Sequence, residues 1–217
     1  PPSVDFRPEG EPLPAAEDGE RQAAIEAVRF EGNTVFGDKV LRAALGADVL
    51  GRAYSLGQLR GLANRVSRHY RNNGYPFARA FLPAQELTDG ELTIRVVEGR
   101  YGRVAATGDE QLLPLADGFL SPLAAGEVIA SDELERVALL LGDQPGIEVA
   151  PTLRPGEDTG TGNLVVAVRE GQRVSGSVRV DNHGNRFSGA NRVRADVRVN
   201  RALTPGDQIR LGGLYTS

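Results

Sequence analysis

Between residues 24 and 100 the spacing of apolar positions changes several times, as expected of alternating strands and helices. Residues 25–30 predict a strand that ends at Gly32, and residues 38–45 predict a short helix that ends at Gly46. Further along, apolar residues recur every three or four positions, which is the period of one helix face. The residues on this face are Leu56, Leu59, Ala63, Val66 and Tyr70.

Local signals mark both ends of this longer helix. Ser55 and Gln58 form a capping-box pattern, in which the serine oxygen accepts an amide hydrogen of the first turn and the glutamine reaches back. Asn73-Gly74 supplies a left-handed stop, and Pro76 prevents the helix from resuming. The opposite face of the helix carries four arginines, at positions 60, 65, 68 and 71.

Two hairpins and a second helix follow. Residues 77–82 and 92–97 predict two strands, and Thr88-Asp89-Gly90 lies between them as a turn. A further strand is expected at residues 104–107, and Ser131 is expected to cap a helix. The inner face of that helix consists of Leu134, Val137, Ala138 and Leu141. Residues 147–153 and 164–169 predict the second hairpin, in which Pro151 fits only an edge strand.

The order of these elements repeats. Val28 and Val104, Gly32 and Gly108, and Ser55 and Ser131 are each 76 positions apart, while residues 92–99 are similar to residues 164–171 at an offset of 72. A nearly constant offset over four elements indicates an internal duplication. Each unit is strand–helix–helix–strand–strand, and three strands with helices over one face form a small α+β layer domain.

The last 46 residues show a different pattern, with apolar and polar residues alternating along three stretches near 174–180, 193–199 and 209–215. This alternation fits strands of a transmembrane barrel, with apolar side chains toward lipid and charged ones toward a wet lumen. A soluble antiparallel sheet gives the same alternation. Three strands cannot close a barrel, so on the barrel interpretation the protein continues beyond Ser217. The expected lumen residues are Arg192, Arg194, Arg198 and Arg210.

Composition gives little support to catalysis or to cofactor binding. The chain has no cysteine, and its two histidines, His69 and His183, are too far apart for a metal-binding pair. There is no nucleophile elbow, and Gly160-Thr161-Gly162 does not complete a phosphate-binding motif. We therefore expect no catalytic residue, no cofactor and no metal. No apolar run reaches 18 residues, so no membrane-spanning helix is expected.

Charge divides the chain into four segments. Residues 1–23 hold five prolines and six acidic residues and predict an extended linker. Residues 24–100 carry eleven basic and eight acidic groups, residues 101–171 four basic and twelve acidic, and residues 172–217 eight basic and three acidic. We expect a first domain at 24–100, a second at 101–171 and barrel strands at 172–217. The arginines are spread out with no aromatic-rich strand beside them, which disfavours nucleic acid as a partner.

A three-stranded sheet leaves an edge strand that can pair with an extended peptide through main-chain hydrogen bonds. The strand that follows the arginine-bearing helix is one such edge, and residues 147–153 form another. We therefore hypothesise that a partner polypeptide binds the first repeat, with charge raising the encounter rate. The expected binding residues are Arg60, Arg65, Arg68, Arg71, Phe77, Ala78, Arg79, Ala80, Phe81 and Leu82.

These residues resemble a known family. Asn73-Gly74-Tyr75-Pro76-Phe77, Pro83-Ala84-Gln85, Asp89-Gly90-Glu91-Leu92 and Val96-Val97-Glu98-Gly99 are similar to the haemolysin-activator type of polypeptide-transport-associated (POTRA) domain. The second repeat matches in the order of its elements, and the tail from Val174 resembles the first strands of the family's barrel. The family comprises the TpsB outer-membrane transporters of two-partner secretion. Its N-terminal plug helix is not evident in residues 1–23.

The resemblance implies an α+β chain of two tandem POTRA domains followed by the opening antiparallel strands of a transmembrane β-barrel. It implies a transporter in the outer membrane of a Gram-negative bacterium, with the POTRA domains in the periplasm and outer-membrane lipid around the barrel. The partner would be a large secreted TpsA-like exoprotein, an adhesin or haemolysin, bound through its N-terminal secretion domain. Two alternatives remain: a general factor for β-barrel assembly, and a relative linked to a lipase domain.

Overall fold

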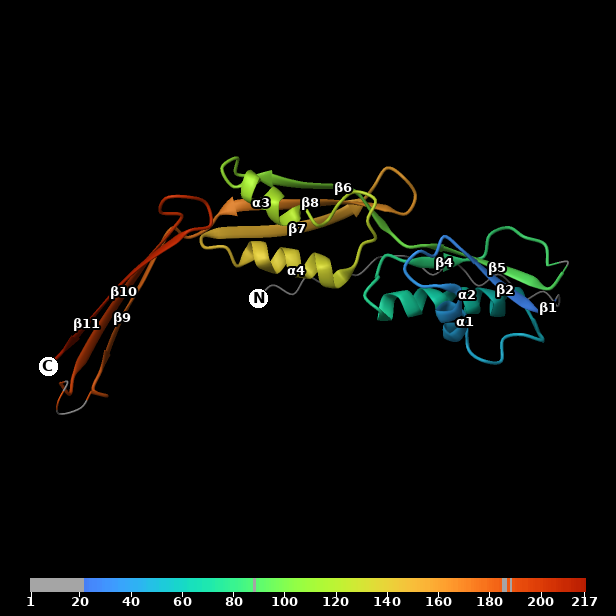
Figure 1. Cartoon of the computed structure of the whole chain (residues 1–217), viewed down its shortest axis with the longest axis horizontal. Helices are drawn as coiled ribbons and strands as arrows, with labels where there is room; N and C mark the ends of the chain where they lie inside the picture. Colours follow the sequence, from blue (N-terminus) through green and yellow to red (C-terminus); the bar gives the residue numbers. More distant parts are fainter. Residues whose placement is uncertain (1–21, 88, 185–186, 188) are drawn as a thin grey trace. The chain divides into compact units, whose positions relative to one another are not determined.

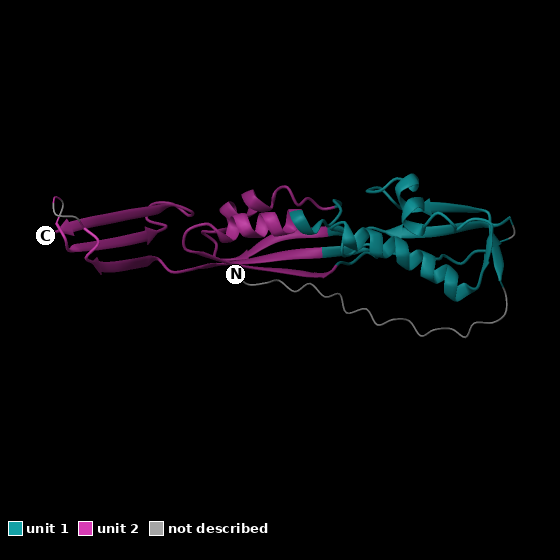
Figure 2. Ribbon diagram, turned by 90° about the horizontal axis from the view of Figure 1, so that it is seen from below, with its two compact units in different colours: residues 1–101, 126–132, 156–162 teal, residues 102–125, 133–155, 163–217 magenta. Residues whose placement is uncertain are grey.

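The computed structural model describes residues 22–184 apart from residue 88, together with residues 187 and 189–217. The expected linker at 1–23 and the turn residue Thr88 therefore lie wholly or mostly outside the described residues. The chain forms two compact units, one of residues 1–101, 126–132 and 156–162 and one of the remainder (Figure 2).

The first unit is built on a mixed three-stranded sheet in the order β2(Ala27–Glu31), β5(Glu91–Val97), β4(Arg79–Phe81). β5 lies in the middle, parallel to β2 and antiparallel to β4. The helices α1(Asp38–Leu45) and α2(Leu56–Asn72) lie on one side of this sheet (Figure 1). The short helix, the capping box at Ser55 and the antiparallel hairpin are confirmed.

The strand predicted at residues 25–30 is in fact two strands. β1(Ala23–Ile25) pairs with β3(Arg52–Tyr54) in a separate small sheet, and β2 begins after a bend at Glu26. The N–H groups of Glu26 and Ala27 both donate to the carbonyl oxygen of Gly90, at 2.8 and 3.2 Å. Two successive amides that share one acceptor interrupt the regular pairing, as in a β-bulge, and the chain bends there.

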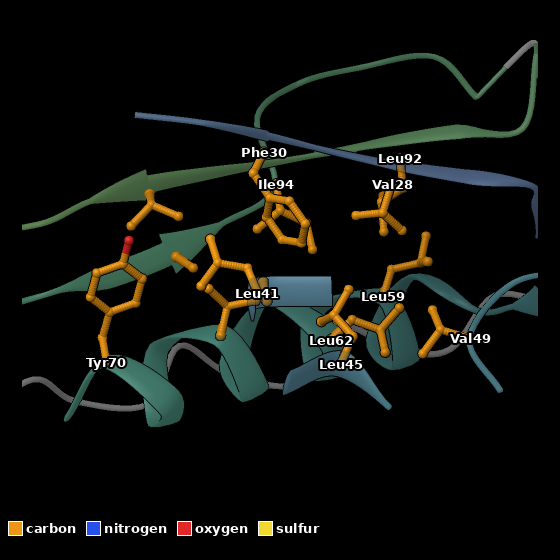
Figure 3. Close-up of a cluster of buried hydrophobic side chains, with 14 of the residues drawn as sticks. Val28, Phe30, Leu41, Leu45, Val49, Leu59, Leu62, Tyr70, Leu92 and Ile94 are labelled. Atoms are coloured by element: carbon orange, nitrogen blue, oxygen red, sulfur yellow. The ribbon is translucent and has the colours of Figure 1, made fainter. Parts of the chain in front are cut away.

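The core of the first unit lies between the two helices and the sheet (Figure 3). Leu41 and Leu45 of α1 and Leu59 and Leu62 of α2 pack against side chains of β2 and β5. The core also contains Val28, Phe30, Val66, Tyr70, Ala78, Ala80, Leu92, Ile94 and Val96.

One residue of the predicted helix face, Leu56, and the strand residue Phe81 lie outside this core. Leu56 is 52% exposed because it is the first residue of α2, where the helix face does not yet meet the sheet. Phe81 is 43% exposed because Ala80 faces the helices, and successive strand residues point to opposite sides.

The second α+β layer repeats this arrangement. Its sheet has the order β6(Arg100–Gly108), β8(Thr161–Glu170), β7(Ile147–Pro155), so the last strand again lies in the middle. Pro151 lies in the edge strand β7, as predicted. Its helices are α3(Leu113–Leu120), which the sequence analysis did not locate, and α4(Ser131–Gly142), which buries Leu134, Val137 and Leu141.

Two glycines show how closely the copies correspond. Gly32 and Gly108 both have positive φ, at 80° and 117°. A Cβ at Gly32 would collide with the carbonyl oxygen of Val96, and one at Gly108 with that of Val168. The same backbone approach, at residues 76 positions apart, supports the internal duplication.

The remaining strands form an antiparallel sheet in the order β11(Gln208–Thr216), β10(Arg192–Asn200), β9(Val174–Asp181). The register places Val193, Val197 and Val199 on one face with Val180, Gly176 and Val174 of β9. The other face carries the charged residues of β10. Among the described residues, no helix has both the length and the apolar character needed to cross a membrane.

Candidate partner-binding site

The predicted binding strand lies at an edge of the first sheet. Within the part of the chain that the structure describes, β4 has only β5 as a strand neighbour, and it is shorter than expected, with three residues in place of six. Phe77, Ala78 and Leu82 therefore lie in its flanks. On its other side β4 packs against α2, the helix that carries the four predicted arginines.

The outward main-chain groups of Ala80 already have a partner. Ala80 pairs with Val96 in register, but its N–H donates to the hydroxyl oxygen of Ser67 on α2 at 2.8 Å. The Ser67 hydroxyl also lies 3.3 Å from the carbonyl oxygen of Ala80 and 3.2 Å from that of Ala63, so its single hydrogen can go to either. Both Ala80 and Ser67 are buried.

The neighbouring edge positions are also paired. The N–H of Ala78 donates to the carbonyl oxygen of Tyr75 at 3.2 Å. Beyond the end of β4, the side-chain amide of Gln85 donates to the carbonyl oxygen of Thr93 and accepts its N–H, both at 2.8 Å. The glutamine of the Pro-x-Gln motif thus takes the place of a strand residue beside β5.

All four predicted arginines are exposed on α2, but they are not equivalent. Arg65 donates to the carbonyl oxygen of Leu45 at 2.6 Å and so satisfies the C-terminal end of α1. Among the described residues, none of the four has an acidic side chain within ion-pair distance. Arg65 and Arg68 border a surface hollow of about 490 Å³, together with Tyr54, Gln58, Gly61 and Leu62.

Glu98, of the motif Val96-Val97-Glu98-Gly99, was not among the predicted site residues, and it organises the end of this unit. Its buried carboxylate accepts the N–H groups of Thr34 and Val35 at 2.6 and 2.8 Å, and also the Thr34 hydroxyl. The carboxylate also accepts a hydrogen bond from the Tyr70 hydroxyl at 2.9 Å, and it forms an ion pair with the Arg100 guanidinium at 3.1 Å.

The titration of this cluster follows from its contacts. Burial alone would raise the pKa of Glu98, but the hydrogen bonds from Thr34, Val35 and Tyr70 outweigh it and lower that pKa. Burial raises the pKa of Tyr70, and the neighbouring carboxylate raises it further. Both groups therefore hold their ordinary charge states at neutral pH, and the cluster serves structure. In the part of the chain that the structure describes, no three acidic or histidine side chains lie together as a metal site.

The predicted lumen arginines lie on the third sheet. Arg192, Arg194 and Arg198 share one face of β10, and Arg198 is the register partner of Arg210 on β11. Arg192 pairs with Asp181 at 2.6 Å, and Arg210 lies 3.6 Å from Asp196. The register thus gathers the charged side chains of β10 on one face.

Comparison with known proteins agrees with this geometry. Residues 23–99 match the family model of the POTRA domain, ShlB-type. The structure of CdiB from Escherichia coli superposes with a TM-score of 0.78 at 22% sequence identity, over 94% of this chain and 38% of that one. Residues 23–99 thus form a POTRA domain of the ShlB type, within a chain of POTRA-like α+β layers.

Sequence comparison extends beyond this domain. The heme/hemopexin transporter protein HuxB of Haemophilus influenzae (strain 86-028NP) is 35% identical over 167 residues, which is 75% of this chain and 29% of HuxB. The outer membrane transporter CdiB of Dickeya dadantii (strain 3937) is 26% identical over 185 residues, 85% of this chain and 32% of that protein. The chain is thus similar to both transporters over most of its own length, and the match spans less than a third of the length of either relative.

Proposed function

We propose that this chain is the periplasmic recognition part of an outer-membrane translocator that secretes a large exoprotein by two-partner secretion. The observation that carries the proposal is the 35% identity to HuxB over 167 residues, which extends well beyond the ShlB-type domain at 23–99. On this proposal residues 24–100 and 101–171 are tandem POTRA domains in the periplasm, and residues 1–23 are the linker before them.

The secreted partner binds through its N-terminal secretion domain at the face formed by β4 and α2. The support is chemical. An edge strand lies beside a helix whose exposed arginines have no acidic partner within the described chain, so acidic or polar partner surface can approach it. The hollow bordered by Arg65 and Arg68 lies on the same helix. The acidic second repeat, which carries four basic and twelve acidic groups, is a poorer match to such a partner.

Residues 172–217 supply the opening strands of the membrane barrel. The support is the separation of faces: apolar residues of β9, β10 and β11 share one side of the sheet, and several exposed ones, including Val178, Val180 and Leu211, are more than two-thirds exposed. A sheet with a bare apolar face is stable against lipid. Arg192, Arg194, Arg198 and Arg210 then border the lumen.

The proposal is tested by co-purification with the N-terminal domain of the large exoprotein whose gene neighbours that of this chain. We expect the 217-residue chain to retain this domain. A variant with Arg60, Arg65, Arg68 and Arg71 all replaced by Gln should bind more weakly and with less dependence on salt. The proposal that the partner binds at β4 and α2 would be wrong if the native chain does not bind, or if the native chain and the four-arginine variant bind equally at every salt concentration. Loss of many unrelated outer-membrane proteins on deletion of the gene would instead favour an assembly factor.

A further inference from the structure

The surface hollow bordered by Arg65 and Arg68 lies on the flank of α2 that faces α1 and β3. Its lining includes Tyr54, the last residue of β3, and α2 residues spaced three or four apart, which share one helix face. Arg65 reaches across to α1, where it donates to the carbonyl oxygen of Leu45. Ser67, which contacts β4, projects from the other flank of α2. The hollow is therefore separate from the edge strand of the sheet.

Two positive charges meet on this flank. Arg65 and Arg68 are exposed and three positions apart, so their side chains lie on adjacent turns of one helix face. Neither takes part in an ion pair between described residues. Like charges one turn apart destabilise a helix, and an anionic group placed beside both relieves the repulsion. The hollow therefore favours an acidic occupant.

The N-terminal part of the chain enters the fold at the rim of this hollow. Ala23, the first residue of β1, pairs in register with Tyr54 of β3. Because the two strands are antiparallel, the residues before Ala23 leave the small sheet at the end where β3 leads into α2. Directly opposite residues of an antiparallel pair have Cα atoms about 4.5–5.5 Å apart. The chain that precedes Ala23 is thus tethered beside a residue that lines the hollow.

This preceding segment is acidic. Residues 1–21 contain six acidic residues and two arginines. Three of the acidic residues, Glu17, Asp18 and Glu20, lie three to six positions before Ala23. The segment and the flank of α2 that it adjoins therefore carry opposite charge.

The reach of these three carboxylates matches the positions of the arginines. An extended chain covers about 3.5 Å per residue, so residues three to six positions before Ala23 can lie about 10–20 Å from the rim of the hollow. A helix rises about 1.5 Å per residue, which places Arg65 and Arg68 roughly 14 and 18 Å beyond the start of α2. The tether is thus long enough for the carboxylates to meet both guanidinium groups.

We propose that residues 17–20 dock across this hollow, pair their carboxylates with Arg65 and Arg68, and cover these arginines until an acidic surface of the secreted partner displaces them. The proposal adds regulation to the proposed function and rests on it for the identity of the displacing partner. The contact between the segment and α2 does not require that partner.

The covalent tether makes such a contact effective. One exposed ion pair changes an equilibrium by a factor of only about two to five. A short tether, however, holds the segment at an effective concentration in roughly the millimolar range. Salt screens exposed pairs, so the contact should weaken as the ionic strength rises.

The test uses the 217-residue chain in a neutral detergent. Because the chain has no cysteine, Ala16→Cys provides a unique position for a nitroxide spin label. At low salt the label should broaden the NMR signals of the Gly61 and Arg65 amides, and high salt should restore them. Arg68→Gln should lower the docked fraction, with a fall of about two- to fivefold in the ratio of docked to free segment. Arg60→Gln is the matched control, because it removes the same charge from α2 outside the hollow and should change nothing.

The acidic segment offers its own matched pair of variants. Neutralising the three nearby carboxylates, by Glu17→Gln, Asp18→Asn and Glu20→Gln together, should abolish the broadening. Neutralising the three distant ones, at Asp5, Glu9 and Glu11, makes the same change of charge at least twelve positions before Ala23 and should preserve it.

Three results would overturn the contact: no broadening on α2 at low salt, equal loss in Arg68→Gln and Arg60→Gln, or equal loss in the two triple variants. Addition of the N-terminal domain of the secreted partner should release the label from α2, and a domain that binds while the broadening persists would overturn the covering role. Because the label reports the contact without any partner, failure of that domain to bind would contradict the proposed function and not this contact.

Discussion

The carboxylate of Glu98 accepts the phenol hydrogen of Tyr70 at 2.9 Å, across 28 residues of chain, and joins the end of α2 to the end of β5. The same carboxylate holds the two amides at Thr34 and Val35, where the chain passes from β2 to α1. Three separate parts of the first POTRA domain thus meet at one buried charge. The motif Val96-Val97-Glu98-Gly99 therefore has a structural role that its letters alone do not reveal.

Glu98 should make the stability of this domain depend on pH. Its pKa in the folded protein lies below the ordinary value of 4.5, so its contribution is complete above that pH and is lost as the pH falls through the lower, folded value. Glu98→Gln should cost about 1–3 kcal/mol near pH 7, because groups that now donate to the carboxylate lose an acceptor. Urea unfolding should therefore show that the free energies of unfolding of the native chain and Glu98→Gln approach each other between pH 7 and pH 3. A difference in unfolding free energy that stays constant over this range would contradict the prediction.

Truncation of the α2 core face should separate two leucines that the sequence alone makes equivalent. Leu59 is 4% exposed and Leu56 is 52% exposed. Leu59→Ala should destabilise the domain by about 2–5 kcal/mol, whereas Leu56→Ala should change its stability by less than about 0.5 kcal/mol. The measurement is the free energy of unfolding of each variant in urea. Similar losses would show that α2 is rotated relative to the structure.

Two glycine substitutions should report on the duplicated layers. Gly32→Ala and Gly108→Ala each place a Cβ against a carbonyl oxygen at a positive φ, and each should cost more than about 1 kcal/mol. Gly61→Ala is the control, because Gly61 lies within α2 with no atom near its added Cβ, and it should stabilise the helix by roughly 0.5–1 kcal/mol. Thermal unfolding of the three variants measures both the expected destabilisation at Gly32 and Gly108 and the expected stabilisation at Gly61. Tolerance of either strained substitution would contradict the close backbone approach.

Gln85 should protect the main chain of β5. Replacing Gln85 by Ala leaves both main-chain groups of Thr93 without the amide that now pairs with them. The Thr93 amide should then exchange with solvent faster, while the Ile94 amide, on the β2 side, should change little. Hydrogen exchange followed by NMR resolves the two. Gln85→Glu retains the acceptor for the Thr93 N–H, so it should restore part of the protection.

The local signals in the sequence predicted most of the first domain. The capping box at Ser55, the stop at Gly46 and the alternation of β5 all depend on residues close together in the chain, and the structure agrees with them. The turn-forming glycines at 32 and 108 likewise marked the ends of equivalent strands. The domain boundaries near residues 100 and 171 stay a prediction.

The features that the sequence analysis missed depend on contacts between distant residues. The bend at Glu26 arises because Gly90, 64 positions away, supplies one acceptor for two amides. Phe81 points outward because the small residue Ala80 is needed where α2 brings Ser67 against the strand. Neither contact leaves a signal in the neighbouring residues of the sequence.

The position of β5 has a consequence for the order of folding. The middle strand of the first sheet comes last in the chain, and it pairs with β2 across about 64 residues, as at Phe30 and Ile94. Pairings of such separation close slowly, because the loop entropy is lost before the contact is gained. α1 and α2 precede the middle strand of the sheet that they cover, so this domain cannot complete its core until β5 has joined β2 and β4. Until then the two helices lack the side chains of β5 as a packing surface.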